Sequence, residues 1–130
     1  MANDVPPTSE PLASADVLLD AERLDAYRVA VEFQVLAAGL LPGRRCPILR
    51  DQLERASVSI ALNTAEAAGR VSPAEKAHFF AIARGSATEC AAILDLLRAR
   101  GLVSGLDYRR GRALLVRVVQ MLTRLSRPER

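Results

Sequence analysis

Aromatic side chains and histidine are scarce in this chain. Phe, Trp and Tyr make up 4% of the 130 residues, tryptophan is absent, and His78 is the single histidine. The core must therefore be assembled from Ala, Leu, Val and Ile, a mixture that suits closely packed helices. One histidine cannot complete a zinc set. No apolar run approaches the ~20 residues that a membrane-spanning helix needs.

Cysteine is also rare, and the two cysteines are far apart in the sequence. Cys46 and Cys90 fall on different predicted helices, with no second metal ligand nearby. We interpret them as two free thiols in a reducing cytosol rather than as reactive groups. The first residues contain neither the basic region nor the apolar core of a signal peptide, which predicts a cytoplasmic protein.

Alternating apolar and polar residues, the pattern of a β-strand, are absent over any useful length, which predicts an all-α fold. Residues 1–19 are rich in proline and small polar residues, so we expect a flexible, disordered N-terminal tail. Residues 127–130 should fray. Helical patterns occupy about 20–41, 47–68, 73–100 and 108–125. Their short connections predict one domain over 20–126, an antiparallel up-down-up-down four-helix bundle.

The turn between the second and third predicted helices carries the clearest boundary signals. Gly69 fits a C-terminal cap. Ser72, Pro73 and Glu75 have the order of an N-cap, a first-turn proline and a capping-box carboxylate. Gly101 is expected to end the third helix.

Steps of three and four residues predict the face that each helix buries. On the second helix they select Leu49, Leu53, Ala56, Ile60, Asn63 and Ala67. On the third they select Glu75, Phe79, Ile82, Ser86, Glu89, Ile93, Leu96 and Arg100, and on the fourth Gly111, Leu115, Val118, Met121 or Leu122, and Leu125. Gly85 costs the third helix about 1 kcal/mol relative to alanine, so we expect another helix to approach closely there.

Polar residues interrupt these faces in the middle of the second and third helices. We predict a structural polar network of Arg55, Ser59, Asn63, Glu66, Arg70, Ser86 and Glu89. A buried carboxylate without a partner would be strongly destabilising. Glu66 and Glu89 should therefore accept hydrogen bonds from the network or from another arginine such as Arg84. Such polar positions often fix helix register or assembly state.

The same residues offer little chemistry. Glu66 and Glu89 could supply two carboxylate ligands of a di-metal site. Such sites in helical bundles also require Glu-x-x-His repeats, and His78 has no glutamate three residues before it. Ser59 and Ser86 have no histidine placed to activate them. No glycine-rich loop follows a strand to hold phosphate. We therefore expect no catalytic residue, no metal site and no cofactor.

Charge is distributed unevenly along the chain. The net charge is +3, and the basic residues are seventeen arginines and Lys76. Residues 1–32 hold seven acids and two arginines, whereas residues 98–130 hold nine arginines and two acids. This asymmetry predicts a basic surface on the last helix.

That basic surface suggests contact with phosphates. The candidate nucleic-acid contacts are Arg109, Arg110, Arg112, Arg117 and Arg124. No aromatic residues are interleaved for stacking on bases, so binding should be directed at the backbone and non-specific. The alternative is a solvated helix face in a protein from an arginine-rich proteome, where the arginines have no role in binding.

The two central helices also carry a recognisable pattern. Residues 55–70 read R-A-S-V-S-I-A-x-N-x-A-E-x-x-G-R, followed by S-x-x-E at 72–75, Phe79, and I-A-R-G-S-x-x-E at 82–89. This pattern resembles the four-helix-bundle proteins of the 23S rRNA intervening-sequence protein family. The superfamily of that family includes the accessory variability determinant of diversity-generating retroelements. The resemblance covers most of 24–125.

The resemblance implies a small cytosolic bundle that assembles into a ring-like homopentamer. Some relatives carry a basic surface thought to contact nucleic acid, and the retroelement members also contact a reverse transcriptase. This chain differs in its longer, acidic N-terminal extension and in having a single lysine where relatives have many. We expect a non-enzymatic oligomeric bundle that binds nucleic acid through its arginines. The alternative is a protein-interaction scaffold with no nucleic-acid role, and neither function involves a membrane.

Overall fold

The computed structural model describes residues 20–41 and 45–127. A 3-10 turn, η1 (Asp20–Arg23), precedes four α-helices: α1 (Asp25–Ala38), α2 (Pro47–Gly69), α3 (Pro73–Ala99) and α4 (Gly105–Leu125). This part of the chain contains no strand, so the all-α prediction is confirmed. The tail predicted for residues 1–19 and the end of the chain at 128–130 lie outside the described residues.

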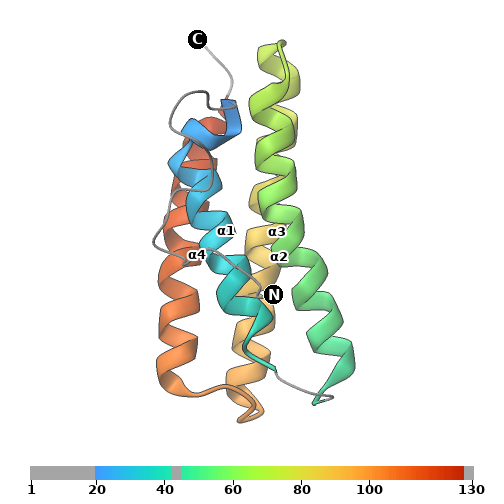
Figure 1. Cartoon of the computed structure of the whole chain (residues 1–130), viewed down its shortest axis with the longest axis vertical. Coiled ribbons are helices and arrows are strands. Elements are labelled where there is room, and N and C mark those ends of the chain that lie inside the picture. The colour runs from blue at the N-terminus through green and yellow to red at the C-terminus, as the bar shows by residue number, and fades with distance from the viewer. Residues whose placement is uncertain (1–19, 42–44, 128–130) are drawn as a thin grey trace, which may run out of the picture.

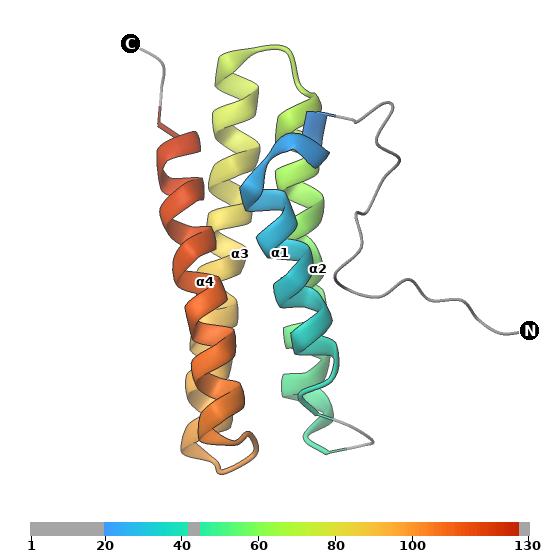
Figure 2. The ribbon, with the colours of Figure 1, turned by 60° about the vertical axis from the view of Figure 1, so that its left-hand side comes forward.

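The four helices lie side by side, with their long axes roughly aligned (Figures 1 and 2). Each helix packs against the next one along the chain, and α4 also packs against α1. The chain reverses direction at each connection (Figure 2). The packing is therefore consistent with the predicted up-down-up-down bundle.

Capping residues explain where α3 and α4 begin and where α3 ends. The Ser72 side chain accepts a hydrogen bond from the backbone N–H of Glu75, as the capping-box pattern predicts. Gly101 has a left-handed φ of 70°, and the N–H of Leu102 bonds to the carbonyl of Leu97 at 2.8 Å. These features form a Schellman cap, which favours glycine because a left-handed φ is strained for other residues.

The start of α4 differs from the prediction. This helix begins at Gly105 rather than near Tyr108, because the Ser104 side chain accepts a hydrogen bond from the N–H of Asp107 at 3.0 Å. The capping serine compensates for the poor helix propensity of glycine in the first turn.

The core lies between the four helices and is built mainly from aliphatic side chains. The largest fully buried side chains include Phe33 of α1, Leu53 and Ile60 of α2, Leu94 and Leu97 of α3, and Leu115 and Leu122 of α4. The buried face predicted for α2 is confirmed apart from Asn63, which is half-buried, and Gly111, Leu115, Val118 and Leu122 of α4 face inward as predicted.

The buried face predicted for α3 is wrong. The residues that α3 buries are Phe80, Ala83, Ala87, Cys90, Ile93, Leu94 and Leu97. Of the predicted positions only Ile93 is buried, whereas Ile82 is 39% exposed and Leu96 is 51% exposed. The helix carries two apolar stripes that lie about one residue apart. The core takes the stripe without charged residues, because an unpaired carboxylate is expensive to bury.

The close helix approach predicted at Gly85 is also wrong. A Cβ atom placed on Gly85 would meet nothing within 4 Å. The close approach occurs instead at Gly111 of α4, where a Cβ atom would lie 2.9 Å from Leu94 Cδ1 and 3.5 Å from Phe33 Cε1. Gly111 therefore lets α4 pack tightly against both α1 and α3.

Candidate nucleic-acid interface and polar groove

The outer face of α4 is strongly basic. All five predicted contact residues are exposed on this helix, and we call them the arginine face: Arg109, Arg110, Arg112, Arg117 and Arg124. Arg110, Arg117 and Arg124 are spaced by seven residues, so they form a row with steps of about 10.5 Å along the helix. The structure thus exposes all five predicted arginines on α4, with Arg110, Arg117 and Arg124 in one row and Arg109 and Arg112 beside it.

The positive charge of the arginine face is not neutralised by ion pairs. Among the described residues, ion pairs join Arg28 to Asp25 and Arg70 to Glu66, and none involves α4. Asp107 is the only acidic residue of α4, and it lies in the first turn. Exposed guanidinium groups without carboxylate partners are well suited to bind phosphate.

A further arginine, which the sequence did not single out as a contact, joins this face from α3. A Cβ atom on Gly105 would lie 3.2 Å from Arg98 Nη2 and 3.3 Å from Arg109 Nη1, so two guanidinium groups converge over the start of α4. In the sequence, only the arginine-rich composition of residues 98–130 indicated that Arg98 could belong to a basic surface. Only the packing of α3 against α4 shows that Arg98 lies next to Arg109.

Polar contacts between α3 and α4 hold this end of the arginine face in place. Tyr108 Oη donates a hydrogen bond to Asp95 Oδ1 at 2.7 Å, and this bond raises the pKa of Tyr108. The positive charges of Arg112 and Arg98 act on that pKa in the opposite direction. Farther along the helices, Arg84 Nε donates to Thr123 Oγ1 at 2.7 Å. Arg84 is therefore a link to α4 and not a partner of Glu66 or Glu89.

The predicted polar network divides into separate parts between α2 and α3. In the first part, the hydroxyl groups of Ser59 and Ser86 lie 2.8 Å apart. Asn63 Nδ2 donates to Ser59 Oγ at 2.9 Å and to the Ser59 carbonyl at 3.0 Å. The Ser59–Ser86 hydrogen bond joins the centres of α2 and α3, and the Asn63 bonds hold Ser59 within α2.

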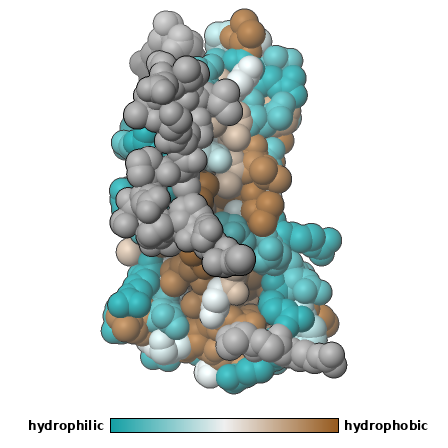
Figure 3. All heavy atoms as spheres, viewed as in Figure 1, coloured by the Kyte–Doolittle hydropathy of each residue, from teal (hydrophilic) through white to brown (hydrophobic). Residues whose placement is uncertain are grey.

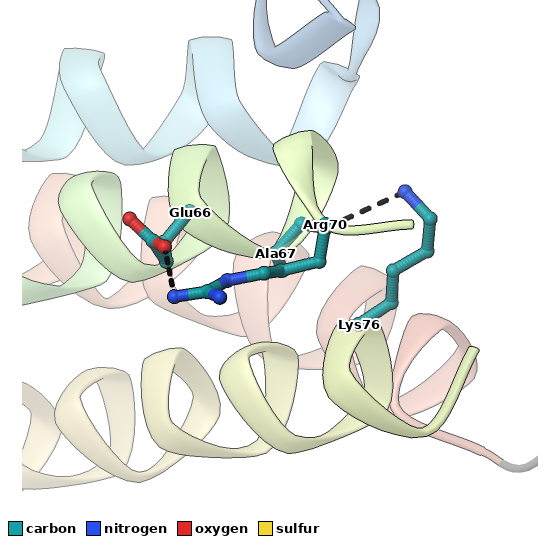
Figure 4. A network of polar contacts seen from close by, with 4 residues as sticks. All are labelled: Glu66, Ala67, Arg70 and Lys76. Carbon is teal, nitrogen blue, oxygen red and sulfur yellow. Dashed lines mark hydrogen bonds and ion pairs between the residues drawn. The ribbon is translucent and has the colours of Figure 1, made fainter. Parts of the chain in front are cut away.

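The second part lies at the turn between α2 and α3 (Figure 4). Arg70 forms an ion pair with Glu66, and its guanidinium carbon lies 4.7 Å from the centre of the Phe79 ring. Lys76 Nζ donates to the carbonyl of Ala68 at 3.0 Å. The last carbonyl groups of a helix have no hydrogen-bond donor within the helix. The Lys76 ammonium group supplies one at the end of α2, and its positive charge is also favourable there.

Arg55 and Glu89 make up the rest of the predicted network. They line a hollow of about 300 Å³ between α2 and α3, together with Gln52, Ala56, Ser59 and Ser86. Neither charged group forms an ion pair with any described residue. The expectation that Glu66 and Glu89 are buried is wrong, because both side chains are exposed at the surface.

The two cysteines are free thiols in different surroundings. Cys90 is buried in the core, and this burial, together with the nearby negative charge of Glu89, raises the pKa of its thiol to about 12. Cys46 is half-buried beside α3, with Arg100 Nη1 lying 3.4 Å from its sulfur. Within residues 20–41 and 45–127, no three His, Cys, Asp or Glu side chains gather as a metal site requires. No described helix is long and apolar enough to cross a membrane.

The helical part of the chain matches the model of a known protein family. The family is described as 23S rRNA-intervening sequence protein, and the match spans residues 22–124, from η1 into the last turn of α4. The chain belongs to this family. No curated protein matches the sequence. For this 23S rRNA-intervening sequence protein the resemblance predicted over most of 24–125 is confirmed, because the family match covers 22–124.

Proposed function

We propose that this member of the 23S rRNA-intervening sequence protein family is a non-enzymatic, cytoplasmic homo-oligomer that binds the phosphate backbone of nucleic acid through the arginine face. The observation that carries the proposal is the set of five exposed α4 arginines without an ion-pair partner among the described residues. Binding of this kind releases the counterions that surround the phosphates and is therefore strongly dependent on salt.

The arrangement of the arginines supports backbone recognition. Arg110, Arg117 and Arg124 offer positive charge in a row along the helix, and arginine contacts to phosphates position a protein on nucleic acid without reading its sequence. The aromatic residue of α4, Tyr108, uses its hydroxyl group to bond Asp95. This helix therefore offers no row of aromatic rings on which successive bases could stack.

The oligomer strengthens the proposed binding. One arginine face makes few contacts, but several copies held in one assembly bind a long polyanion with a much higher apparent affinity. The resemblance of the central helices implies a ring of five copies. The proposal includes no catalysis, and the hydrogen bond between the hydroxyl groups of Ser59 and Ser86 supports this, because neither hydroxyl is paired with a histidine.

The test is an electrophoretic mobility shift with duplex and single-stranded nucleic acid, titrated with salt. We expect binding at low salt that weakens steeply as salt rises. Arg110→Glu with Arg117→Glu should abolish binding or weaken it at least tenfold. Arg28→Glu with Arg45→Glu is the matched control, since it changes the net charge equally at two exposed positions outside α4 and should retain binding.

Two results would contradict the nucleic-acid proposal. One is no binding even at low salt, and the other is equal binding by the α4 variant and its control. Co-purification of a stoichiometric protein partner without nucleic acid would instead identify an interaction scaffold.

A further inference from the structure

Two arginines converge where α3 ends and α4 begins, at one end of the bundle (Figure 1). A Cβ atom on Gly105 would lie 3.2 Å from Arg98 Nη2 and 3.3 Å from Arg109 Nη1. Both guanidinium groups therefore lie over the same point of the first turn of α4, where glycine has no side chain to keep them apart. We call Arg98 and Arg109 the arginine pair.

Neither guanidinium group of the arginine pair is neutralised. Both side chains are exposed, and neither forms an ion pair with any described residue. The nearby acidic residues of the two helices, Asp95 and Asp107, form no ion pair with them either. Two positive groups held this close repel each other. An anion bound between them removes that repulsion and accepts a charge-assisted hydrogen bond from each.

A hydrogen bond between the two helices positions the arginine pair. Tyr108 Oη donates to Asp95 Oδ1 at 2.7 Å. Asp95 lies one turn before Arg98 on α3, and Tyr108 directly precedes Arg109 on α4, so the bond fixes the backbone beside both guanidinium groups. Although this bond raises the pKa of Tyr108, the positive charges of Arg112 and Arg98 act to lower it, which places both of these arginines near the tyrosine. A site that is held in place before its ligand arrives loses less entropy on binding.

We infer that the arginine pair binds a phosphomonoester, namely the terminal phosphate of a nucleic-acid strand. A phosphomonoester carries a charge of about −1.5 to −2 at pH 7 and has three acceptor oxygens. A phosphate inside a strand carries one negative charge. Two converging guanidinium groups match the higher charge and the additional oxygen of the terminal group, because each can donate two parallel hydrogen bonds.

The position of the arginine pair suits the end of a strand. Arg109 is followed directly by Arg110, the first residue of the row that continues with Arg117 and Arg124. This row leads away from the pair toward the opposite end of the bundle (Figure 1), and Figure 3 shows hydrophilic surface at the lower left, over the first turns of α4. A strand whose terminal phosphate lies at the pair can therefore continue along the row with its internal phosphates. The inference rests on the proposed function and adds to it a preference for strand ends.

The test compares three short single-stranded oligonucleotides of one sequence, each with an internal fluorescent label. One has a 5′-phosphate, one has a 3′-phosphate, and one has hydroxyl groups at both ends. Fluorescence anisotropy at low salt measures their affinity for the full-length protein. At least one phosphorylated oligonucleotide should bind about tenfold more tightly than the unphosphorylated one, because both guanidinium groups gain a doubly charged partner. Equal affinity for all three would overturn the inference.

A matched pair of variants separates the site from general electrostatic attraction. Arg98→Gln with Arg109→Gln should erase the preference for the terminal phosphate. Arg117→Gln with Arg124→Gln removes the same charge from the row, so it should weaken all three oligonucleotides equally and keep the preference. A preference that survives in the first variant, or that is lost equally in both, would contradict the assignment to the arginine pair.

A third variant keeps the charge of the arginine pair and changes its geometry. Lysine is a point charge without the planar fork of arginine. Arg98→Lys with Arg109→Lys should therefore retain affinity for the unphosphorylated oligonucleotide while losing most of the preference. A preference as large as that of the wild type would overturn recognition through two guanidinium forks. Circular dichroism should show equal helix content in all variants, because the substituted side chains are exposed.

A nucleoside 5′-monophosphate distinguishes a strand end from a free phosphomonoester. It carries the same terminal group without internal phosphates, so it should compete with the phosphorylated oligonucleotide at least tenfold more weakly than an unlabelled copy of that oligonucleotide does. Its binding should be lost in Arg98→Gln with Arg109→Gln. A monophosphate that competes as well as the oligonucleotide would assign the arginine pair to a free phosphomonoester and overturn the preference for strand ends.

The outcomes for this site and for the proposed function can be told apart. Oligonucleotide binding that depends on Arg110 and Arg117 but shows no preference for a terminal phosphate would support the proposed function and remove the site. Binding of the monophosphate without binding of any oligonucleotide would remove the proposed function and the strand end with it, and would leave a phosphomonoester site at the arginine pair.

Discussion

At the scale of single residues, two glycines within helices differ in what surrounds them. Gly85 is exposed on α3 and has open space around its Cα, whereas Gly111 is buried against Leu94 and Phe33. Glycine lowers helix stability at both positions because the unfolded chain gains conformational freedom. Only at Gly111 does tight packing compensate, because a methyl group there would collide with a buried leucine.

This contrast predicts opposite effects of alanine. Gly85→Ala should raise the free energy of unfolding by up to about 1 kcal/mol, since it adds helix propensity without a clash. Gly111→Ala should lower it by about 1 kcal/mol or more, because overpacking outweighs the propensity gain. Urea denaturation of both variants measures the difference. A Gly111→Ala protein at least as stable as the wild type would show that α4 can shift away from Leu94.

The buried thiol of Cys90 makes stability dependent on pH in the alkaline range. Its pKa is raised from 9.0 to about 12, so the folded protein holds the proton where the unfolded chain loses it. The contribution of the thiol is fully present below pH 9.0 and is lost as the pH rises toward 12, by at most about 1.4 kcal/mol per pH unit.

The Cys90→Ala variant isolates this effect from the titration of other groups. We expect the stability difference between wild type and variant to be constant below pH 9 and to shrink as the pH rises above 9. Urea denaturation at several pH values measures it. A difference that stays constant up to pH 11 would mean that the thiol ionises equally in both states.

At the scale of helices, the number of apolar stripes on a helix decides whether its buried face can be predicted from the sequence. The second and fourth helices each have one dominant stripe, and Leu53, Ile60, Leu115 and Leu122 are buried as predicted. The third helix has two stripes, and local periodicity cannot choose between them. Contacts with α2 and α4 make that choice, so the polar residues on the other stripe lie at the surface.

The ends of the helices were predictable wherever a capping residue was recognised. The Ser-x-x-Glu pattern located the start of α3 at Pro73, whereas Ser104 was not identified as a cap and α4 was predicted too short. The structure shows that Ser104 and Ser72 cap their helices in the same way, each accepting a hydrogen bond from the residue three positions later.

Removal of the Ser104 cap should destabilise the bundle measurably. Ser104→Ala leaves the backbone N–H of Asp107 without its acceptor, which typically costs about 1 kcal/mol. Ser104→Asp, which can accept the same hydrogen bond, should retain most of the stability. Thermal unfolding of the two variants compares them. Equal melting temperatures for Ser104→Ala and the wild type would show that solvent replaces the cap without loss.

At the scale of the whole molecule, charge and apolar surface are separated onto different sides. The arginine face lies on α4, whereas the hollow between α2 and α3 is lined by one arginine, Arg55, and one glutamate, Glu89.

Assembly should make the stability of the protein depend on its concentration. Because association favours the folded chain, the melting temperature should rise as the protein concentration increases. Differential scanning calorimetry over a hundredfold range of concentration tests this. A melting temperature that does not change with concentration would indicate a monomer.

The sequence by itself determined the number of helices, most of their boundaries, the buried faces of α2 and α4, and the concentration of arginine on α4. These features follow from local spacing, capping and composition, which act within a few turns of one helix. The tertiary structure decided which stripe of α3 enters the core, that Gly111 and not Gly85 is the point of close packing, and that Arg98 joins the arginine face. Each of these depends on which helices become neighbours, because burial is settled by contacts between segments distant in the chain.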